Sequence, residues 1–307
     1  MTTLAKPVYL IAIAVCLLPV VSAPVALALG IFYGLTWHHP WPALNAQASR
    51  RLLQISVVGL GFGVPLVEVW QVGKGSFFST LIGILTTLAI GSLLGRWLKV
   101  PQGTSLLVSC GTAICGGSAI AAMTPVIKAE NDESAVALAT VFTLNAVALL
   151  VFPLIGHLFH LEQHQFGTWA GMAIHDTSSV VGAAASYGLE ALETATTVKL
   201  SRALWIAPLA LIAGLLTNSG QRAKVPLFIL LFIAAAAIHS AVPSGQPAWE
   251  AIATVARHAL VVSLFFVGAG LNRGLLKQVG ARTLTQGVTL WLIISSLTLT
   301  AVHYHII

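Results

Sequence analysis

The sequence predicts an all-α polytopic membrane protein of ten or eleven transmembrane helices, and three observations predict it. Of the 307 residues, 57% are hydrophobic and 8% are charged, and the mean hydropathy is +0.91. A soluble domain carries roughly 25% charged residues, so this composition excludes an ordinary soluble protein. Apolar runs of about the length of a membrane span follow one another with short connections, and lysine and arginine are unevenly shared between those connections.

The first two runs are shorter than the roughly 20 residues of a usual span. Val8–Pro19 and Ser22–Trp37 are interrupted by Pro19 and Pro24, and they are predicted to be two short helices. The first is expected to be a retained span, because no cleavage site of a secretory signal follows it. The clearer spans that follow are Ser49–Trp70, Ser76–Trp97, Thr104–Ile127, Ser134–Leu158, Phe166–Tyr187, Thr197–Asn218, Val225–Ala241, Trp249–Gly270 and Thr283–Tyr304. Since every connection is short, residues 1–307 are predicted to form one membrane domain.

Lysine and arginine predict the orientation of the chain. With the N-terminus in the cytoplasm and eleven spans, the inside connections hold Lys6, Arg50, Arg51, Arg96, Lys99, Arg222, Lys224, Arg273, Lys277 and Arg282. The outside connections hold Lys74, Lys128, Lys199 and Arg202, and Arg257 is left within a span. This positive-inside bias predicts a cytoplasmic N-terminus and an external C-terminus. The basic residues are scattered over short loops, so no nucleic-acid partner is expected.

The run Val108–Lys128, VSCGTAICGGSAIAAMTPVIK, is interrupted in its middle. Three glycines stand among three hydroxyl residues at the interruption, and Pro125 follows later in the run: Gly111, Gly116, Gly117, Ser109, Thr112 and Ser118. Such a break is tolerated at membrane depth where it is buried in protein or lines a cavity, as in transporter binding sites. The alternative is that the small residues only let neighbouring helices pack closely.

A second glycine-broken run, Phe265–Asn272, gives the first a partner. With the first short helix set aside, the other ten spans form two groups of five, and the fourth member of each group is broken. Five spans per half require inverted halves, which is the pattern of secondary transporters. The predicted division is an extra N-terminal helix in residues 1–21, a first repeat in 22–158 and a second, inverted repeat in 166–305. Coincidence is the alternative, because glycine is common in membrane helices.

Ionisable residues within membrane spans are costly and usually functional, and His175 and Asp176 are the strongest group here. One helical face would carry an imidazole followed by small and hydroxyl residues: His175, Ser178, Ser179, Gly182 and Ser186. Alternatively, Asp176 or Thr177 caps a half-helix that starts at this point. Both placements favour a substrate or proton site, with His175 as the proton carrier. The competing interpretation is a satisfied pair that fixes helix contacts.

Other polar residues carry weaker expectations. Glu68 and Arg202 lie near span ends and are expected at the membrane interface. Arg257 either snorkels to the interface or supplies charge to an anion. Asn145 either joins two helices or lines the cavity next to the break. The remaining candidates for a metal or disulfide are expected to be interfacial or simply buried: His157, His160, His164, Cys16, Cys110 and Cys115.

Two segments resemble the YeiH family, bacterial inner-membrane proteins that are described as sulfate exporters. One is Cys115-Gly116-Gly117-Ser118-Ala119-Ile120 with Pro125–Glu130, and the other is His175–Ala184. The likeness extends over essentially the whole chain, including Val267–Leu271, although the first helices are shorter here than the family pattern. The resemblance implies the fold of cation:proton antiporters and bile-acid symporters, in which two discontinuous helices cross in a core domain beside a panel domain.

The expected function is secondary transport of a small anion, such as sulfate, a sulfonate or a related oxyanion, by alternating access. Half-helix N-termini favour negative charge, and neither broken run carries a carboxylate. The predicted substrate-binding residues are Ser109, Thr112, Gly116, Gly117, Ser118, His175, Ser178, Ser179, Gly268 and Asn272. Coupling to H⁺ or Na⁺ is expected at His175 and Asp176. The alternative on the same fold is a Na⁺/H⁺ antiporter with Asp176 as the ion ligand.

Two other classes are more remote: a non-transporting membrane receptor and an intramembrane enzyme. An enzyme is not expected, because the sequence has neither an HExxH motif nor paired intramembrane aspartates. The expected partners are the lipid bilayer and a small inorganic or organic anion. No cofactor or metal is expected, and the small-residue faces are compatible with a homodimer.

Overall fold

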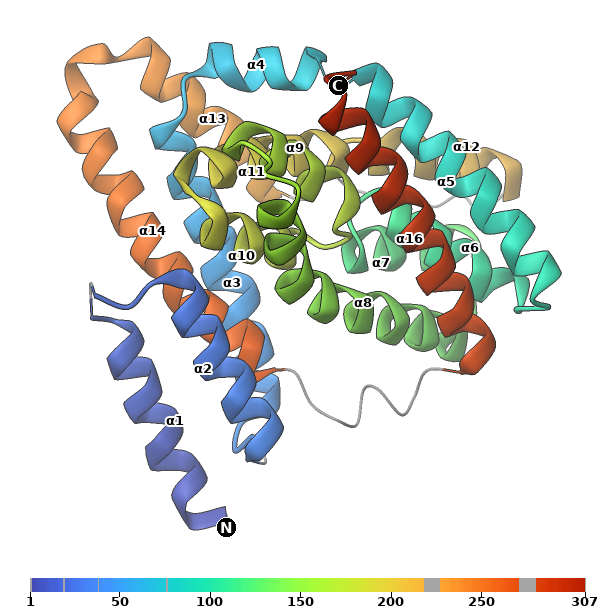
Figure 1. Ribbon diagram of the computed structural model, residues 1–307, viewed down its shortest axis with the longest axis horizontal. Coiled ribbons are helices and arrows are strands. Elements are labelled where there is room, and N and C mark those ends of the chain that lie inside the picture. Colours follow the sequence, from blue (N-terminus) through green and yellow to red (C-terminus); the bar gives the residue numbers. More distant parts are fainter. Residues whose placement is uncertain are drawn as a thin grey trace. The chain divides into compact units, whose positions relative to one another are not determined.

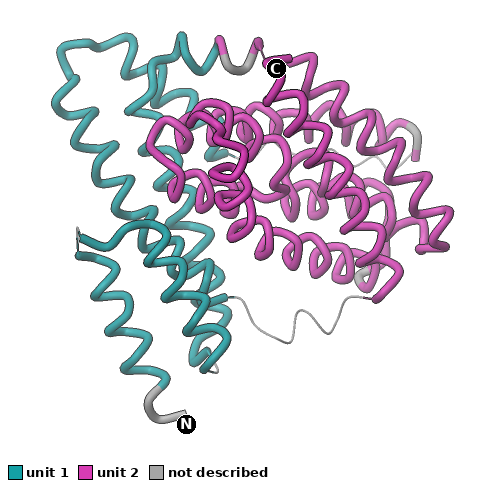
Figure 2. The backbone as a smooth tube through the Cα atoms, viewed as in Figure 1, with its two compact units in different colours: residues 1–70, 226–273 teal, residues 71–225, 274–307 magenta. Residues whose placement is uncertain are grey.

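The structure is a computed structural model, and it describes residues 2–18, 20–37, 39–75, 77–217, 227–270 and 280–306. Within these ranges all regular elements are helices, so the predicted all-α class is confirmed (Figure 1). The chain forms two compact units, and each unit is assembled from two separate stretches (Figure 2). Unit 1 comprises residues 1–70 and 226–273, and unit 2 comprises residues 71–225 and 274–307.

Unit 1 contains the first helices of the chain and two later ones. They are α1 (Thr2–Cys16), α2 (Ala23–Thr36), α3 (Pro42–Leu60), the 3₁₀ turn η1 (Gly61–Gly63), α13 (Leu227–Ala241), the 3₁₀ turn η2 (Pro243–Gly245) and α14 (Gln246–Ala269). Helix α4 (Leu66–Gly75) begins in unit 1 and ends in unit 2. Pro24 and Pro42 stand in the first turns of α2 and α3, where the missing N–H has no helical partner to lose. The predicted separation of the first two helices is therefore present.

Helix α14 packs along α2 and α3 within unit 1 (Figure 1). Glycines allow the close approach to α2. A Cβ atom on Gly30 would lie 2.2 Å from the Phe265 carbonyl oxygen, and one on Gly268 would lie 2.6 Å from the Leu27 oxygen. Backbone contact through small residues is a common basis of helix association in membranes.

Unit 2 contains the interrupted helices. Its elements are α5 (Phe77–Trp97), α6 (Gln102–Ala113), α7 (Gly117–Val126), α8 (Asn131–Leu158), α9 (Gln163–Ala173), α10 (Thr177–Tyr187), α11 (Leu189–Ala203), α12 (Ile206–Thr217) and α16 (Ala281–His303). Helices α6, α7 and α8 share a core of buried apolar side chains that includes Val108, Ile120, Met123 and Val141. Burial of this kind is the main favourable term that holds the half-helices against their neighbours inside the unit.

Five stretches of the described chain are long and apolar enough to cross a membrane. They are Phe77–Trp97, Asp132–Leu158, Leu189–Leu215, Pro243–Ala269 and Ala281–His303. Shorter apolar helices accompany them: Ala5–Cys16, Ala23–Thr36, Gly117–Val126 and Leu227–Ala241. The chain is therefore a multi-pass membrane protein. The total of eleven spans and the two inverted five-helix repeats stay predictions.

Three predicted spans differ from the structure. One is Thr197–Asn218, because α11 already begins at Leu189 and ends at Ala203, before α12 starts at Ile206. Ser49–Trp70 is wrong as a single helix, because α3 ends at Leu60 and the chain passes through η1 and Pro65 before α4 begins. Phe166–Tyr187 is also wrong as a single helix, because Asp176 starts a new helix within it. The result is two half-helices, α9 and α10, in place of one span.

The expected second break lies at the edge of the described chain. Helix α14 runs through Val267 and Gly268 and ends at Ala269, within the run Phe265–Asn272. Gly268 lies in contact with α2. Residues 271–279, which include Asn272, lie outside the described residues, so this break stays a prediction. The described chain has a further interruption at residues 174–176, which the first break contacts.

Candidate functional site

Two interrupted helices define the candidate site in unit 2. The first passes from α6 to α7 through residues 114–116, and the second passes from α9 to α10 through residues 174–176. Gly116 has φ 61° and ψ −124°, a conformation that a side chain disfavours, so glycine is needed at the first break. At the second break Ile174 and Asp176 are both extended, and the helix restarts on the Asp176 carboxylate.

The two breaks touch each other. A Cβ atom on Gly116 would lie 3.1 Å from the Asp176 Cβ and 3.3 Å from its Cα. The residues on both sides of the breaks are buried, including Ile114, Cys115, Ile174 and His175. Backbone groups of four half-helix ends therefore meet in the interior of unit 2. In an apolar interior each of those groups needs a partner, because leaving it unpaired is costly.

The same short motif stands at both breaks in the same register. Gly111-Thr112-Ala113-Ile114 precedes the first break, and Gly171-Met172-Ala173-Ile174 precedes the second. In each case the alanine ends the helix, the isoleucine follows it, and the helix restarts after an N-cap residue two positions later. The N-cap residue is Gly116 at the first break and Asp176 at the second. The two breaks thus share this register, and they differ in backbone conformation and in one carboxylate.

Asp176 caps the N-terminus of α10 with both carboxylate oxygens. The backbone N–H groups of Ser178 and Ser179 donate to it at 3.0 Å, and their hydroxyls donate at 2.7–2.8 Å. The capping interpretation of Asp176 is confirmed. Since the carboxylate is held by the end of its own helix, the two serine hydroxyls predicted as substrate ligands are directed to Asp176.

Two buried cations from α11 reach the other ends of the broken helices. Lys199 is 0% exposed and Arg202 is 1% exposed. The Lys199 Nζ donates to the Ile174 carbonyl oxygen at 2.6 Å, and the Arg202 Nη2 donates to the Ala113 carbonyl oxygen. Helix C-termini carry partial negative charge, so each cation stabilises the end of one first half-helix. The expected interfacial position of Arg202 is wrong, because this side chain is buried within unit 2.

Helix α11 packs closely against α9 because two residues of α9 at the contact are glycines. A Cβ atom on Gly167 would lie 2.8 Å from the Ala191 carbonyl oxygen, and one on Gly171 would lie 2.9 Å from the Val198 Cβ. The four-residue spacing of the glycines puts both on one face of α9. Lys199 directly follows Val198, so this contact sets the distance of its ammonium group from the break.

Several buried polar atoms around the breaks have no hydrogen-bond partner within the described chain. His175 is 1% exposed, and both of its ring nitrogens are unpaired. Its backbone N–H donates to the Asn145 Oδ1 at 3.2 Å, which leaves the Asn145 Nδ2 unpaired. The Arg202 Nε and the Thr112 Oγ1 are unpaired as well. Buried polar groups in this state usually have a bound water or ligand as their partner.

The other predicted site residues are distributed more widely. Ser109 donates to the Ser105 oxygen at 2.7 Å, and its side chain lies against Gly91 of α5, away from the break. Gly117 packs against Phe142 of α8, and Ser118 is exposed at the start of α7. Gly268 belongs to unit 1. In the part of the chain that the structure describes, no cluster of three histidine, cysteine, aspartate or glutamate side chains is arranged to hold a metal ion.

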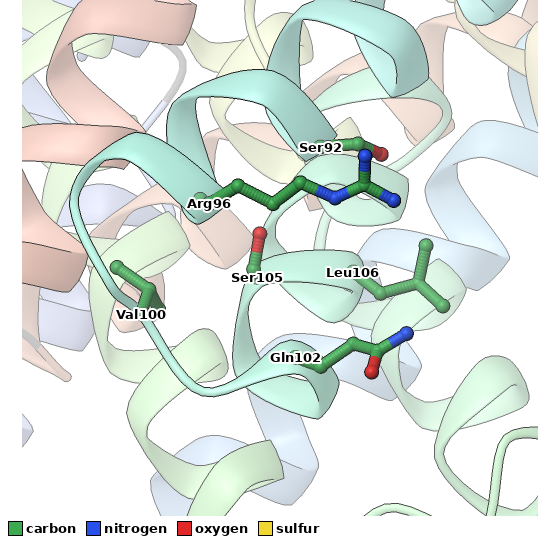
Figure 3. A pocket seen from close by; sticks show the side chains of 7 residues that line it. Ser92, Arg96, Val100, Gln102, Ser105 and Leu106 are labelled. Carbon is green, nitrogen blue, oxygen red and sulfur yellow. The ribbon is translucent and has the colours of Figure 1, made fainter.

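A cavity of about 220 Å³ lies at the other end of α6, and Figure 3 shows Arg96 extending across it towards Ser92. Its further lining residues are Gly95, Val100, Gln102, Ser105 and Leu106. Helix α6 has 12 residues, so the cavity mouth at Gln102 is roughly 18 Å from the break at Ala113. The cavity is therefore a feature separate from the crossed breaks.

Comparison with known proteins places the chain in a family. The family described as Conserved hypothetical protein 698 matches residues 2–287. The chain belongs to this family. UPF0324 membrane protein GSU2818 of Geobacter sulfurreducens is 54% identical to it over 300 residues, which cover 98% of this chain and 97% of that protein. UPF0324 membrane protein Bd1437 of Bdellovibrio bacteriovorus is 47% identical, covering 98% and 95% of the two chains.

A third UPF0324 membrane protein, VP0936 of Vibrio parahaemolyticus, is 45% identical over 298 residues, which cover 94% of this chain and 95% of that protein. No solved structure matches the chain. The predicted YeiH membership is confirmed, because this is the family that matches. The names of these relatives describe them as membrane proteins, in agreement with the apolar helices of the structure.

Proposed function

We propose that this UPF0324 protein is a secondary transporter of a small anion, with its binding site at the crossed breaks of unit 2. The observation that carries the proposal is the charge at the breaks: two buried cations, Lys199 and Arg202, accompany one carboxylate, that of Asp176. One positive charge is therefore in excess in a water-poor interior. An uncompensated buried charge is costly, and a bound anion offsets it.

Alternating access is the mechanism that fits a site at membrane depth between half-helices. We place the protein in the bacterial inner membrane, with a cytoplasmic N-terminus and an external C-terminus, following the positive-inside bias. The predicted cargo is sulfate, a sulfonate or a related oxyanion. His175, buried beside the break with both ring nitrogens unpaired, is the proposed proton carrier.

The Na⁺/H⁺ antiporter is the second candidate, and one observation speaks against it. A sodium ion would need the Asp176 carboxylate as a ligand, but that carboxylate already accepts two backbone N–H groups and the hydroxyls of Ser178 and Ser179. The breaks also carry two cations, which repel a sodium ion as long as no anion is bound, and protonation of His175 would likewise accompany the bound anion. A proton-coupled anion site is the better fit to these charges.

The test is transport by purified protein in liposomes. Uptake of radiolabelled sulfate and methanesulfonate is measured with and without a pH gradient and with and without Na⁺. Lys199→Met and Arg202→Met are expected to lower uptake by about tenfold or more, since a charge-assisted hydrogen bond contributes about 1.5–3 kcal/mol. Lys74→Met, which removes an exposed cation on α4, is the matched control and retains wild-type uptake.

Two results would overturn this proposal. One is wild-type protein that moves neither anion under any gradient. The other is a Lys199→Met, Arg202→Met double variant that transports as well as the Lys74→Met control. Na⁺-driven proton movement that is independent of any added anion would favour the antiporter instead.

A further inference from the structure

We propose that the N-terminus of α7 is an oxyanion subsite, in which the transported anion takes the place that the Asp176 carboxylate takes at α10. The proposal rests on the transport function above and names the atoms that receive the anion. They are the first backbone N–H groups of α7, the Ser118 hydroxyl and the Arg202 guanidinium. The argument begins from the likeness of the two breaks and from the single carboxylate by which they differ.

The shared register makes Gly116 the counterpart of Asp176. Ala113 and Ala173 both end a helix, Ile114 and Ile174 both follow it, and the next helix begins after the N-cap residue in each case. Two positions beyond each N-cap stands a serine, Ser118 in α7 and Ser178 in α10. A carboxylate is therefore present at one of two matching helix starts and missing at the other.

The missing carboxylate leaves the start of α7 without a side-chain cap within the described chain. At α10, the Asp176 oxygens satisfy the N–H groups of Ser178 and Ser179. At α7, the thiol of Cys115 lies near the Ser118 hydroxyl and the Ala119 N–H. Thiol sulfur is a weak acceptor, so these donors are poorly satisfied and are available to an oxyanion.

Arg202 provides an independent pointer to a ligand at this break. Its guanidinium reaches the first break, where Nη2 donates to the Ala113 oxygen, and it is 1% exposed. Its Nε–H has no partner in the described part of the chain. Thr112, which precedes Ala113, is 2% exposed, and its hydroxyl also has no hydrogen-bond partner in the described chain. A fork of buried guanidinium donors beside an uncapped helix start matches a planar or tetrahedral oxyanion.

Glycine at 116 keeps the subsite open. A side chain at this position would be strained, because φ is 61°, and its Cβ would lie 3.1 Å from the Asp176 Cβ. Within the described chain, no side chain therefore caps α7. The chemistry of Asp176 on α10 also indicates what fits: a group with two oxygens that accept N–H and O–H bonds together. Carboxylates, sulfonates and sulfate present such a pair, and a halide does not.

The experiment adds the missing carboxylate to the chain. In Gly116→Asp and Ser118→Asp a fixed carboxylate would occupy the α7 donors, and Gly116→Asn and Ser118→Asn are the neutral controls of equal shape. Ser118 is exposed and lies in a helix, so the Ser118→Asp and Ser118→Asn proteins are expected to fold even if the strained position 116 does not tolerate substitution. The purified full-length proteins are titrated with sodium sulfate, methanesulfonate, acetate and chloride at constant ionic strength. Anion binding is read from the rise in Tm and from calorimetry.

Wild-type protein is expected to bind sulfate or methanesulfonate and to respond much less to chloride. Each Asp variant is expected to bind the oxyanion about tenfold or more weakly than its Asn control, because its carboxylate occupies the α7 donors and repels a second anion. Equal binding by a folded Ser118→Asp protein and its Asn control would overturn the subsite, as would a response to chloride as strong as to sulfate. Wild-type protein that binds none of the four anions would also overturn it.

Liposome flux separates failure of the subsite from failure of the transporter. If wild-type protein transports sulfate and the Asp variants bind it like their controls, the subsite is wrong and the transport function stands. If wild-type protein binds oxyanions and the Asp variants do not, but no flux is measured, the subsite stands and the transport function is wrong.

Discussion

Replacing Gly171 by alanine tests whether the contact of α9 with α11 positions the buried cations. The added Cβ would lie 2.9 Å from the Val198 Cβ and Cγ1 and 3.0 Å from the Ala195 oxygen. Carbon atoms in contact prefer about 3.5–4.0 Å, so the helices must separate by roughly 0.6–1.1 Å. Lys199 follows Val198, and its 2.6 Å bond to the Ile174 oxygen would lengthen to about 3.2–3.7 Å, the limit of a hydrogen bond.

Two effects of Gly171→Ala are expected from this displacement. Overpacking of a tight contact costs about 1–3 kcal/mol, so the Tm of the purified protein falls. Misplacement of a binding group by about 1 Å costs up to about 100-fold in rate, so anion flux falls by more than the stability loss explains. Both quantities are measured on the same preparation, by thermal denaturation in detergent and by uptake into liposomes at a temperature well below the Tm.

Gly83→Ala is the matched control for Gly171→Ala. Gly83 also lies within a helix, α5, but a Cβ atom there would meet nothing within 4 Å. This variant is expected to retain wild-type flux and Tm. If Gly171→Ala behaved in the same way as Gly83→Ala, the close helix contact would not position Lys199, and the reasoning would be refuted.

The remaining predictions concern one residue each. Asp176→Ala is expected to lower the free energy of unfolding by about 1–2 kcal/mol, because α10 loses its cap. Asp176→Asn is expected to lower it by less, because asparagine also caps helices. Equal Tm values for both variants and the wild-type protein would contradict this prediction. His175→Ala is expected to abolish proton-coupled anion uptake. Its buried ring lies against Trp291, so the Tm is also expected to fall through the cavity that is left, and uptake is compared well below the Tm; retained coupling excludes His175 as the proton carrier. Asn45→Ala removes the hydrogen-bond partner of the Tyr9 hydroxyl and of the Phe266 carbonyl oxygen. The free energy of unfolding is expected to fall by about 1–3 kcal/mol for each group left unpaired, as measured by thermal denaturation. An unchanged Tm would show that water replaces the amide.

The first break was predictable from the sequence because its cause is local. Gly116 adopts φ 61°, and a Gly-Gly pair among hydroxyl residues is a recognisable signal of such a conformation. The role of Asp176 as a cap was predictable as one of two alternatives for the same reason, since an N-cap bonds only to residues two and three positions ahead. Short-range chemistry of this kind is written in consecutive residues.

The partner break and the two cations could not be located in this way. The predicted break in Phe265–Asn272 reaches beyond the described residues, and α14 ends at Ala269 within it. The interruption that contacts the first break was missed because it depends on Asp176, with no glycine between Ile174 and Ser178. Lys199 and Arg202 were assigned to a span end, yet α11 already begins at Leu189. Their carbonyl partners lie 25 and 89 positions away, a separation that only the tertiary fold reveals.

The four half-helix ends at the breaks together account for the charges found there. The C-termini of α6 and α9 carry partial negative charge and receive Arg202 and Lys199, and the positive N-terminus of α10 receives Asp176. Three of the four ends are thus matched by a side chain of opposite charge, and the fourth, the N-terminus of α7, has none in the described chain. This end is positive, and with Lys199 and Arg202 both protonated the side chains leave one positive charge in excess, so the anion proposed above would complete the set. Binding of the anion would neutralise the excess charge, and its release would leave the charge uncompensated again. The bound and empty states of unit 2 would then favour different conformations, because the anion interacts differently with each of them.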